Sequence, residues 1–274
     1  MNAWVFDKPD AVRLTEARLA FLRNLLPVIG PALNLRTALD LGCGVGYFSS
    51  FLQGIGFHVT GLDGRPENVE EARKRCSDAR FAIANVEDPD LSNLGAFDFV
   101  LCFGLLYHLE NPFRALRNLR AVTTKLALIE SICVPDPHPT LHLRQETQTE
   151  DQGLNFVAFY PSESCLVSLL YRAGFESVYR LARLPNHEDF CSTSLRKKLR
   201  TMLVASTVPL ASDFLIQIPE TAISLSYGAW ETGWGRAWSR VEGLWGVASK
   251  PWSGKLATTR RYLRRVGSDP VLSK

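Results

Sequence analysis

The chain has 274 residues, a formal net charge of +3 and 46% hydrophobic residues, so it can bury a sizeable core and is not a disordered chain. The most apolar long stretch, residues 202–225, contains prolines and acids that a membrane-spanning helix would tolerate poorly. The start of the chain lacks the basic and then apolar pattern of a signal peptide, and the six cysteines include no Cys-x-x-Cys pair. These features predict a cytoplasmic protein with reduced cysteines and no bound metal.

An N-terminal helical arm, residues 1–36, comes first, with a helix predicted over residues 11–26 that ends before Pro27. Strands and helices then alternate through residues 37–206. The expected strands are 37–41, 57–63, 80–84, 97–103, 125–132, 176–182 and 200–206, and the expected helices are 47–53, 66–75, 112–122 and 162–173. Alternation of this kind predicts an α/β fold with a Rossmann-like, doubly wound, mostly parallel seven-stranded sheet that has helices on both faces. Ligands of such sheets bind at the carboxyl ends of the strands.

A glycine-rich turn follows the first predicted strand, in the run Ala-Leu-Asp-Leu-Gly-Cys-Gly-Val-Gly over residues 38–46. Glycines let the backbone approach a ligand, and Asp63 closes the second strand, where a carboxylate can accept both ribose hydroxyls. A dinucleotide fingerprint would need glycine in place of Tyr47, which disfavours an NAD-dependent oxidoreductase. The pattern therefore predicts a nucleotide-like cofactor, and the alternative is an ordinary tight turn of an α/β protein.

The Asp-x-Gly-x-Gly-x-Gly pattern resembles motif I of the class I S-adenosylmethionine (SAM)-dependent methyltransferases. Strand 97–103 with the Gly-Leu-Leu-Tyr-His that follows resembles the fourth-strand motif of that family, and residues 85–88 resemble its adenine-binding loop, although many members have aspartate where Asn85 stands. The resemblance implies SAM as the cofactor and S-adenosylhomocysteine (SAH) as its product. It implies these cofactor-binding residues: Asp40, Gly42, Cys43, Gly44, Gly46, Asp63, Gly64, Asn85, Val86, Glu87, Phe103, Gly104 and Leu105.

Methyl transfer from a sulfonium is an in-line displacement, so the protein mainly aligns the nucleophile and excludes water. A base helps when the nucleophile is a hydroxyl, and His108 is the first candidate because histidine titrates near neutral pH. The alternative role of His108 is to cap the loop before Pro112. Tyr107 is expected to orient the substrate or shield the sulfonium. Glu130, near the end of strand 125–132, is a second candidate base, or it ties down a neighbouring loop.

Residues 133–160 interrupt the alternation with a polar segment. Because this insertion follows the fifth predicted strand, it should lie over the open side of the cofactor, and long loops in compact domains are commonly functional. The candidate substrate contacts on it are His138, His142, Arg144 and Glu146. The alternative is a solvated connection that carries no catalytic group.

Residues 207–274 are assigned to a C-terminal extension. Its part from residue 226 onward holds nine Lys/Arg, three Asp/Glu and five of the six tryptophans. Trp230, Trp234 and Trp238 are four residues apart and would form one stripe on a helix, although several glycines make a regular helix doubtful. Such a segment is suited to an anionic membrane surface or to nucleic acid, and the simpler expectation is that it packs on the domain or on a second subunit.

A narrower resemblance runs through residues 37–206. The order Gly-Leu-Leu-Tyr-His, Leu-Ile-Glu-Ser, Phe-Tyr-Pro-Ser and Lys-Leu-Arg-Thr-Met-Leu-Val is similar to the tRNA uridine carboxymethyltransferase family and its methyltransferase relatives. The chain lacks the long N-terminal region of those tRNA enzymes, and Ala158 stands where we expect their tyrosine that helps hold the extra carboxylate of the cofactor. We therefore expect methyl transfer from SAM to a hydroxyl of a small molecule or glycan. The alternatives are a tRNA wobble-uridine (carboxy)methyltransferase and a non-catalytic SAM-binding module.

Overall fold

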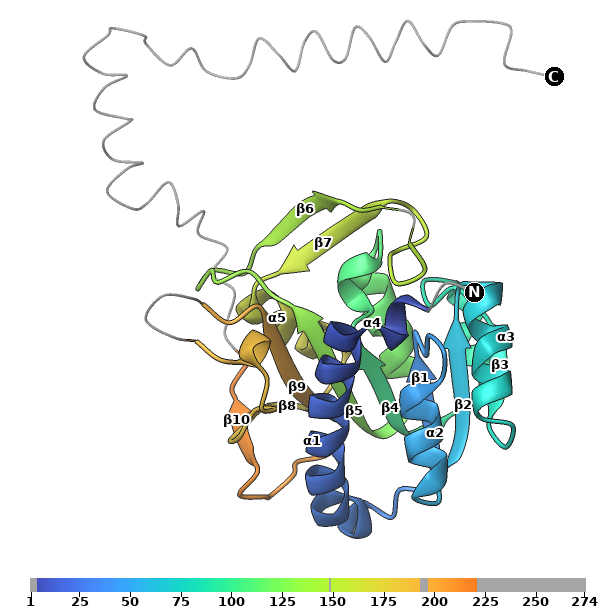
Figure 1. The fold of residues 1–274 in the computed structure, drawn as a ribbon. Helices are drawn as coiled ribbons and strands as arrows, with labels where there is room; N and C mark the ends of the chain where they lie inside the picture. Colours follow the sequence, from blue (N-terminus) through green and yellow to red (C-terminus); the bar gives the residue numbers. More distant parts are fainter. Residues whose placement is uncertain (1–3, 148, 193–196, 221–274) are drawn as a thin grey trace, which may run out of the picture. The chain divides into compact units, whose positions relative to one another are not determined.

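The computed structural model describes residues 4–147, 149–192 and 197–220. A large central sheet forms the middle layer of this part of the chain (Figure 1). Within it, eight strands pair in the order β10-β8-β9-β5-β4-β1-β2-β3. Neighbouring strands from β3 to β5 are parallel, whereas β9 is antiparallel to β5 and β8, and β10 is antiparallel to β8. The strands are β1 Thr37–Leu41, β2 His58–Asp63, β3 Arg80–Ile83, β4 Phe97–Phe103, β5 Thr123–Ile132, β8 Ser177–Leu181, β9 Arg200–Ser206 and β10 Leu215–Ile218.

Helices cover both faces of this sheet, as Figure 1 shows for α1 and α2 on the near side. They are α1 Pro9–Leu33, α2 Tyr47–Gly54, α3 Pro66–Arg75, α4 Pro112–Val122 and α5 Glu163–Ala173. Leu25 of α1 belongs to the same buried cluster as Phe99 of β4, and α4 and α5 contribute to a second cluster that includes Val100 of β4. Successive residues of β4 thus face opposite helical layers. The structure confirms the predicted Rossmann-like, mostly parallel α/β fold.

The N-terminal helix is longer than predicted, since α1 continues through Pro27 and Pro31 to Leu33. Proline inside a helix removes a backbone hydrogen bond and costs about 3 kcal/mol or more. The helix nevertheless continues because Leu26 and Ile29 are buried against the sheet, and because Asn34 caps the end in a left-handed conformation. The segment predicted as an arm is therefore part of the core.

The sheet has one more strand than the seven predicted, and the extra strand lies in the segment assigned to the C-terminal extension. Strand β10 pairs with β8, with Gln217 opposite Tyr179. Only four residues form this strand, and a prolyl residue, Pro219, follows it. So short a run gives a weak periodic signal, which explains why the sequence pattern does not identify it.

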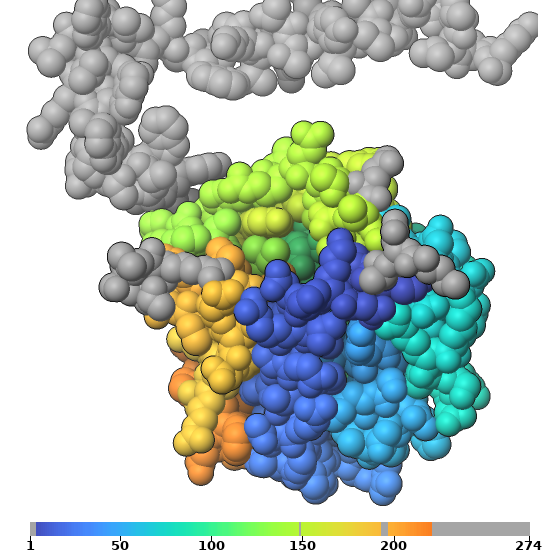
Figure 2. Space-filling model, in the orientation of Figure 1, coloured from blue at the N-terminus to red at the C-terminus, as the bar shows by residue number. Residues whose placement is uncertain are grey.

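The insertion at residues 133–160 contains regular structure that the sequence analysis does not predict. Strand β6, Leu141–Gln145, pairs antiparallel with β7, Val157–Pro161, in a separate two-stranded sheet. Strand β7 lies against the short 3₁₀ helix η3, Leu106–His108, which follows β4. Figure 2 shows this insertion, in lime, across the end of the described part where helix α1 begins. The insertion therefore reaches the carboxyl-terminal edge of the parallel strands.

Three further short 3₁₀ helices are η1 Val5–Asp7, η2 Pro89–Leu94 and η4 Glu188–Phe190. No helix of residues 4–147, 149–192 or 197–220 has both the length and the apolar character needed to cross a bilayer. The predicted tryptophan stripe of the C-terminal tail lies outside the described residues.

Candidate active site

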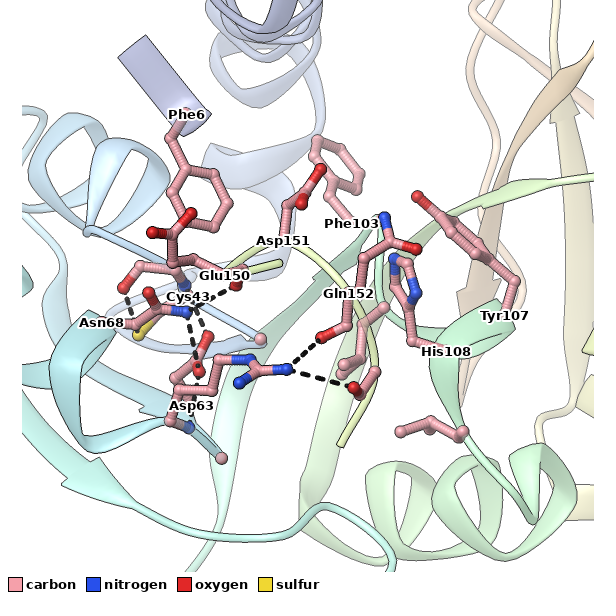
Figure 3. Close-up of a pocket in the computed structure, with 18 of the residues that line it drawn as sticks. Phe6, Cys43, Asp63, Asn68, Phe103, Tyr107, His108, Glu150, Asp151 and Gln152 are labelled. Carbon is pink, nitrogen blue, oxygen red and sulfur yellow. Dashed lines mark hydrogen bonds between the residues drawn. The ribbon is translucent and has the colours of Figure 1, made fainter. Parts of the chain in front are cut away.

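A cavity of about 320 Å³ opens at the carboxyl ends of β1, β2 and β4, where open α/β sheets bind their ligands. Its volume lies in the range of small-molecule sites. Stretches that are distant in sequence form its wall: η1, the first half of α1, the glycine loop after β1, the turn after β2, residues 84–87 after β3, the loop after β4, and residues 146 and 150–155 of the insertion, together with Ile132, Tyr160 and Arg200. Figure 3 shows residues from these stretches facing one another across the cavity.

The glycine loop has a backbone that other residues would strain. Gly42 and Gly44 have φ angles of +68° and +52°, a region in which glycine is at ease. A Cβ atom on Gly42 would lie 3.0 Å from Leu105, and one on Gly44 would lie 3.2 Å from the ring of Phe6. The loop therefore approaches the cavity as bare backbone, which suits close contact with a ligand.

Asp63 ends β2 and lines the cavity beside this loop. Its Oδ2 accepts the N–H of Gly44 at 2.9 Å, and its Oδ1 accepts the N–H of Arg65 at 2.9 Å and the amide of Asn68 at 3.2 Å. Burial raises the pKa of Asp63, and the backbone hydrogen bonds from Arg65 and Gly44 oppose that effect. These bonds fix the position of the carboxylate, so it can receive hydroxyl donors without further rearrangement.

Most of the residues predicted to hold the cofactor meet at this cavity. Those that line it are Gly42, Cys43, Gly44, Asp63, Gly64, Asn85, Val86, Glu87, Phe103, Gly104 and Leu105. Asp40 and Gly46 are not among its lining residues. The carboxylate of Asp40 is buried behind the loop, where Ser49 Oγ donates to it at 2.7 Å and where burial raises its pKa to about 7. A Cβ atom on Gly46 would lie 3.2 Å from Ala72 of α3, so this glycine permits close packing of the loop against that helix.

His108 and Tyr107 lie in η3 and line the same cavity. The Nδ1 atom of His108 lies 2.6 Å from Glu146 Oε1, and the side chains are 10% and 4% exposed. Glu146 Oε2 accepts the N–H of Gly153 at 2.8 Å. Because one ring nitrogen of His108 is held by a carboxylate, the other nitrogen, Nε2, is left for a different partner.

Glu130 is fully buried, and both of its carboxylate oxygens are engaged. Arg18 of α1 donates to Oε2 at 2.6 Å, and Arg200 of β9 donates to Oε1 at 2.9 Å. Arg200 also donates to the hydroxyl of Tyr107 at 3.3 Å. Both arginines line the cavity, whereas Glu130 is not among its lining residues. Glu130 thus joins helix α1 and strand β9 to β5, rather than tying down a neighbouring loop, and its role as a base stays a prediction.

Of the four predicted substrate contacts, one lines the cavity and three do not. Glu146 lines the cavity, whereas His138, His142 and Arg144 are not among the lining residues. His142 and Arg144 lie in β6, and the guanidinium of Arg144 lies over the ring of Tyr160 at 6.0 Å. Tyr160 itself lines the cavity and meets Tyr107 edge to face, with ring centroids 5.7 Å apart. Ala158, two residues earlier in β7, is buried and does not line the cavity.

Sequence reasoning misses several residues that line the cavity: Phe6, Arg18, Arg65, Asn68, Tyr160 and Arg200. Arg18 could have been identified from the sequence, because it lies four residues from both Leu14 and Leu22, on the apolar face of the predicted helix. A charged side chain on such a face needs a buried partner. Phe6 and Arg200 carry no comparable signal, because long-range contacts bring them to the site.

The cavity lies at the carboxyl ends of parallel strands, the place where open α/β sheets bind their ligands. Residues 14–180 match the family model described as a methyltransferase domain. The chain belongs to the methyltransferase domain family, which confirms the resemblance to the class I SAM-dependent methyltransferases that the sequence motifs predict.

Two curated relatives illustrate the sequence similarity. The tRNA U34 carboxymethyltransferase of Edwardsiella ictaluri is 30% identical over 188 residues, which cover 65% of this chain and 54% of the relative. The tRNA U34 carboxymethyltransferase of Shewanella woodyi is 32% identical over 171 residues, which cover 57% and 48%. The chain thus spans about half the length of the curated relatives it matches.

Two solved structures share the fold. The N-terminal domain of EvdMO1 with SAH bound has a TM-score of 0.53 and 24% identity, and the match covers 70% of this chain and 79% of that one. Magnesium protoporphyrin IX methyltransferase (ChlM) from Synechocystis PCC 6803 with bound SAH has a TM-score of 0.50 and 18% identity, with 72% and 83% covered. At these identities, the similarity concerns the fold alone.

Proposed function

We propose that this chain transfers the methyl group of SAM to a hydroxyl of a small molecule or glycan. The observation that carries the proposal is the contact of His108 with Glu146 at the cavity, 2.6 Å from Nδ1 to Oε1. A hydroxyl nucleophile must lose its proton during transfer, and an imidazole oriented by a carboxylate is a general-base arrangement suited to that task.

The residues at the other end of the cavity fit the proposed cofactor. Asp63 offers a fixed carboxylate for ribose hydroxyls, and glycine at positions 42 and 44 lets Leu105 and Phe6 pack directly on the loop backbone beside the proposed cofactor. Residues 85–87 line the cavity on the side where the resemblance places the adenine. When bound, SAM supplies an electrophilic methyl group on a sulfonium.

The chain's own groups then have separate tasks. His108 Nε2 would accept the proton of the acceptor hydroxyl, and Glu146 would stabilise the imidazolium that forms. Tyr107 is held by Arg200 and packs against the imidazole, with ring centroids 4.1 Å apart, so it would orient the acceptor. Phe6 covers the glycine loop and would exclude water from that side.

A second candidate is carboxymethyl transfer to a tRNA wobble uridine, which is favoured by the names of the curated relatives. A carboxylated cofactor needs a cation near its carboxylate, and Arg18 and Arg200 line the cavity. Both arginines already pair with Glu130, and Arg200 also pairs with Asp189 at 3.4 Å, so two carboxylates offset the two positive charges. This balance favours plain SAM.

Calorimetric titration of the ligand-free protein with SAM, its carboxylated form and NAD would test the proposal, followed by transfer of isotope-labelled methyl groups to a panel of hydroxyl-bearing molecules. Preference for SAM with label on a small molecule or glycan is the expected result. Preference for the carboxylated form, together with strongly salt-dependent RNA binding, would support the second candidate. Binding of neither SAM nor its carboxylated form would overturn both.

A further inference from the structure

We propose that Arg65 is a positioning residue that couples the cofactor end of the cavity to the His108–Glu146 pair through the loop at residues 149–153. The inference rests on the proposed function and deepens it. It assigns a role to a residue that belongs neither to the glycine motif nor to the His108–Glu146 pair. Its basis is a continuous series of hydrogen bonds across the mouth of the cavity.

The series begins at the carboxylate of Asp63. The backbone N–H of Arg65 donates to Asp63, and the Arg65 guanidinium donates through Nη2 to the carbonyls of Gln152 at 3.2 Å and Gly153 at 3.1 Å. Asn68 makes a parallel link, because its amide donates to Asp63 at 3.2 Å and to the carbonyl of Glu150 at 3.3 Å. Figure 3 shows these bonds as dashed lines between the Asp63 region and the loop.

The series of hydrogen bonds ends at the pair formed by His108 and Glu146. The N–H of Gly153, next to the carbonyl that Arg65 holds, donates to Glu146 at 2.8 Å, and Glu146 holds His108. Gly153 is also closely packed against His108 and Glu146. A Cβ atom on Gly153 would lie 2.5 Å from the carbonyl oxygen of His108 and 2.8 Å from Glu146 Oε2. No side chain fits at residue 153, and a shift of the loop there would stretch the hydrogen bond that holds Glu146.

A second observation points to a ligand at the same guanidinium. Arg65 Nε is buried and has no hydrogen-bond partner among the described residues. A buried donor without a partner is unfavourable, and a ligand oxygen beside Asp63 would satisfy it if the guanidinium turned toward the cavity on binding. Arg65 lines the cavity, so its guanidinium would contact the ligand and the loop together.

These contacts give the coupling a physical form. An irregular loop loses conformational freedom when it is ordered, and a planar, charged guanidinium that binds two successive carbonyls restricts it strongly. A ligand that orders the guanidinium of Arg65 would order the loop, and the loop in turn would fix Glu146 against His108. By linkage, an ordered loop would also strengthen ligand binding.

The experiment uses the full chain with SAH as the probe. Amide hydrogen exchange would report on residues 149–153, and the Cε1–Hε1 NMR signal would report on His108. In the wild type, saturating SAH should slow exchange in the loop at least tenfold and shift the His108 signal. Arg65→Met at saturating SAH should lose both responses, and Arg65→Lys should restore them in part. Arg73→Met is the matched control, because Arg73 donates to the carbonyl of Phe81 and takes no part in the series.

Two results would overturn the coupling. In the first, Arg65→Met retains both responses once SAH is saturating. In the second, Arg65→Met does not fold, and Asn68→Ala, which removes one anchor of the loop, leaves the protection of the loop by SAH unchanged. Failure of the wild type to bind SAH is a different outcome, because it would overturn the proposed function and this inference with it.

Discussion

The guanidinium of Arg18 donates to the carboxylate of Glu130 at 2.6 Å, and this ion pair joins helix α1 to strand β5. Glu130 is fully buried, and Arg200 takes its second oxygen. Removal of one member of a buried ion pair leaves an uncompensated charge in the interior, which costs about 3–5 kcal/mol. The pair therefore anchors the wall of the cavity that faces Tyr107.

Glu130→Gln should lower the free energy of unfolding by about 3 kcal/mol, because buried Arg18 then faces a neutral amide, whereas partly buried Arg200 still pairs with Asp189 at 3.4 Å. Urea unfolding followed by circular dichroism would measure the change, and Glu110→Gln at an exposed position is the control. A variant of normal stability that has lost turnover would instead support Glu130 as the catalytic base.

Asp63→Ala should weaken SAH binding by more than tenfold. Hydrogen bonds to a charged group contribute about 1.5–3 kcal/mol, and this carboxylate is the fixed acceptor at the proposed ribose site. Isothermal titration calorimetry would measure the affinity, with the exposed Asp78→Ala as control. Equal affinities of Asp63→Ala and the wild type for SAH would rule out this placement of the cofactor.

His108→Gln and Glu146→Gln should each lower turnover, by up to about 10²–10⁴-fold for His108, the size of a general-base contribution. SAH affinity should change little in His108→Gln. Steady-state rates with the acceptor found by the methyl-transfer screen would measure the effect. His142→Gln is the matched control, since His142 lies in β6 and does not line the cavity. An equal loss in His142→Gln would contradict the assignment.

Asp40 should make stability fall as the pH rises. Burial raises the pKa of Asp40 to about 7, against about 3.9 for an aspartate in an unfolded chain. The folded state therefore binds the proton more tightly, and the contribution of Asp40 is full below about pH 4 and is lost as the pH rises to about 7. Asp40→Asn keeps a neutral group, so above about pH 7 it should be more stable than the wild type, by on the order of 3 kcal/mol.

Urea unfolding without cofactor, from about pH 4 to about pH 8, would measure this difference. Asp98→Asn provides a contrast of opposite sign. Asp98 is partly buried, yet the hydrogen bond from Lys125 helps to lower its pKa to about 2, so Asp98→Asn should be less stable at neutral pH. Parallel stability curves for Asp40→Asn and the wild type would contradict the expected effect of burial.

Local patterns predicted most of the fold. Strand β4 is a continuous apolar run, and its predicted bounds, 97–103, equal the observed ones because a strand buried on both faces needs no partner to be recognised in sequence. The end of α1 could not be predicted in this way. Burial of Leu26 and Ile29 against distant strands outweighs the local effect of Pro27, and this contribution is invisible in a single segment.

The same division holds for the cavity. Residues that lie next to a motif along the chain, such as Gly44 and Asp63, could be predicted because the motif and the strand order place them together. Arg200 lies 93 positions after Tyr107, and their contact depends on β9 lying beside β5. Glu146 was predicted as a substrate contact, and the structure places its carboxylate on His108 and Gly153. The partners of a side chain such as that of Glu146 depend on how the whole chain folds, so the sequence around it does not reveal them.

The carboxylate that holds His108 belongs to the insertion at residues 133–160, not to the sheet that carries the glycine loop. Replacing this insertion with that of another family member would replace Glu146, the partner of His108, and one wall of the cavity at the same time. Under the proposed mechanism, acceptor choice and proton handling are then inherited together. The cofactor half can stay constant only if the new insertion keeps backbone carbonyls in place for Arg65 and Asn68.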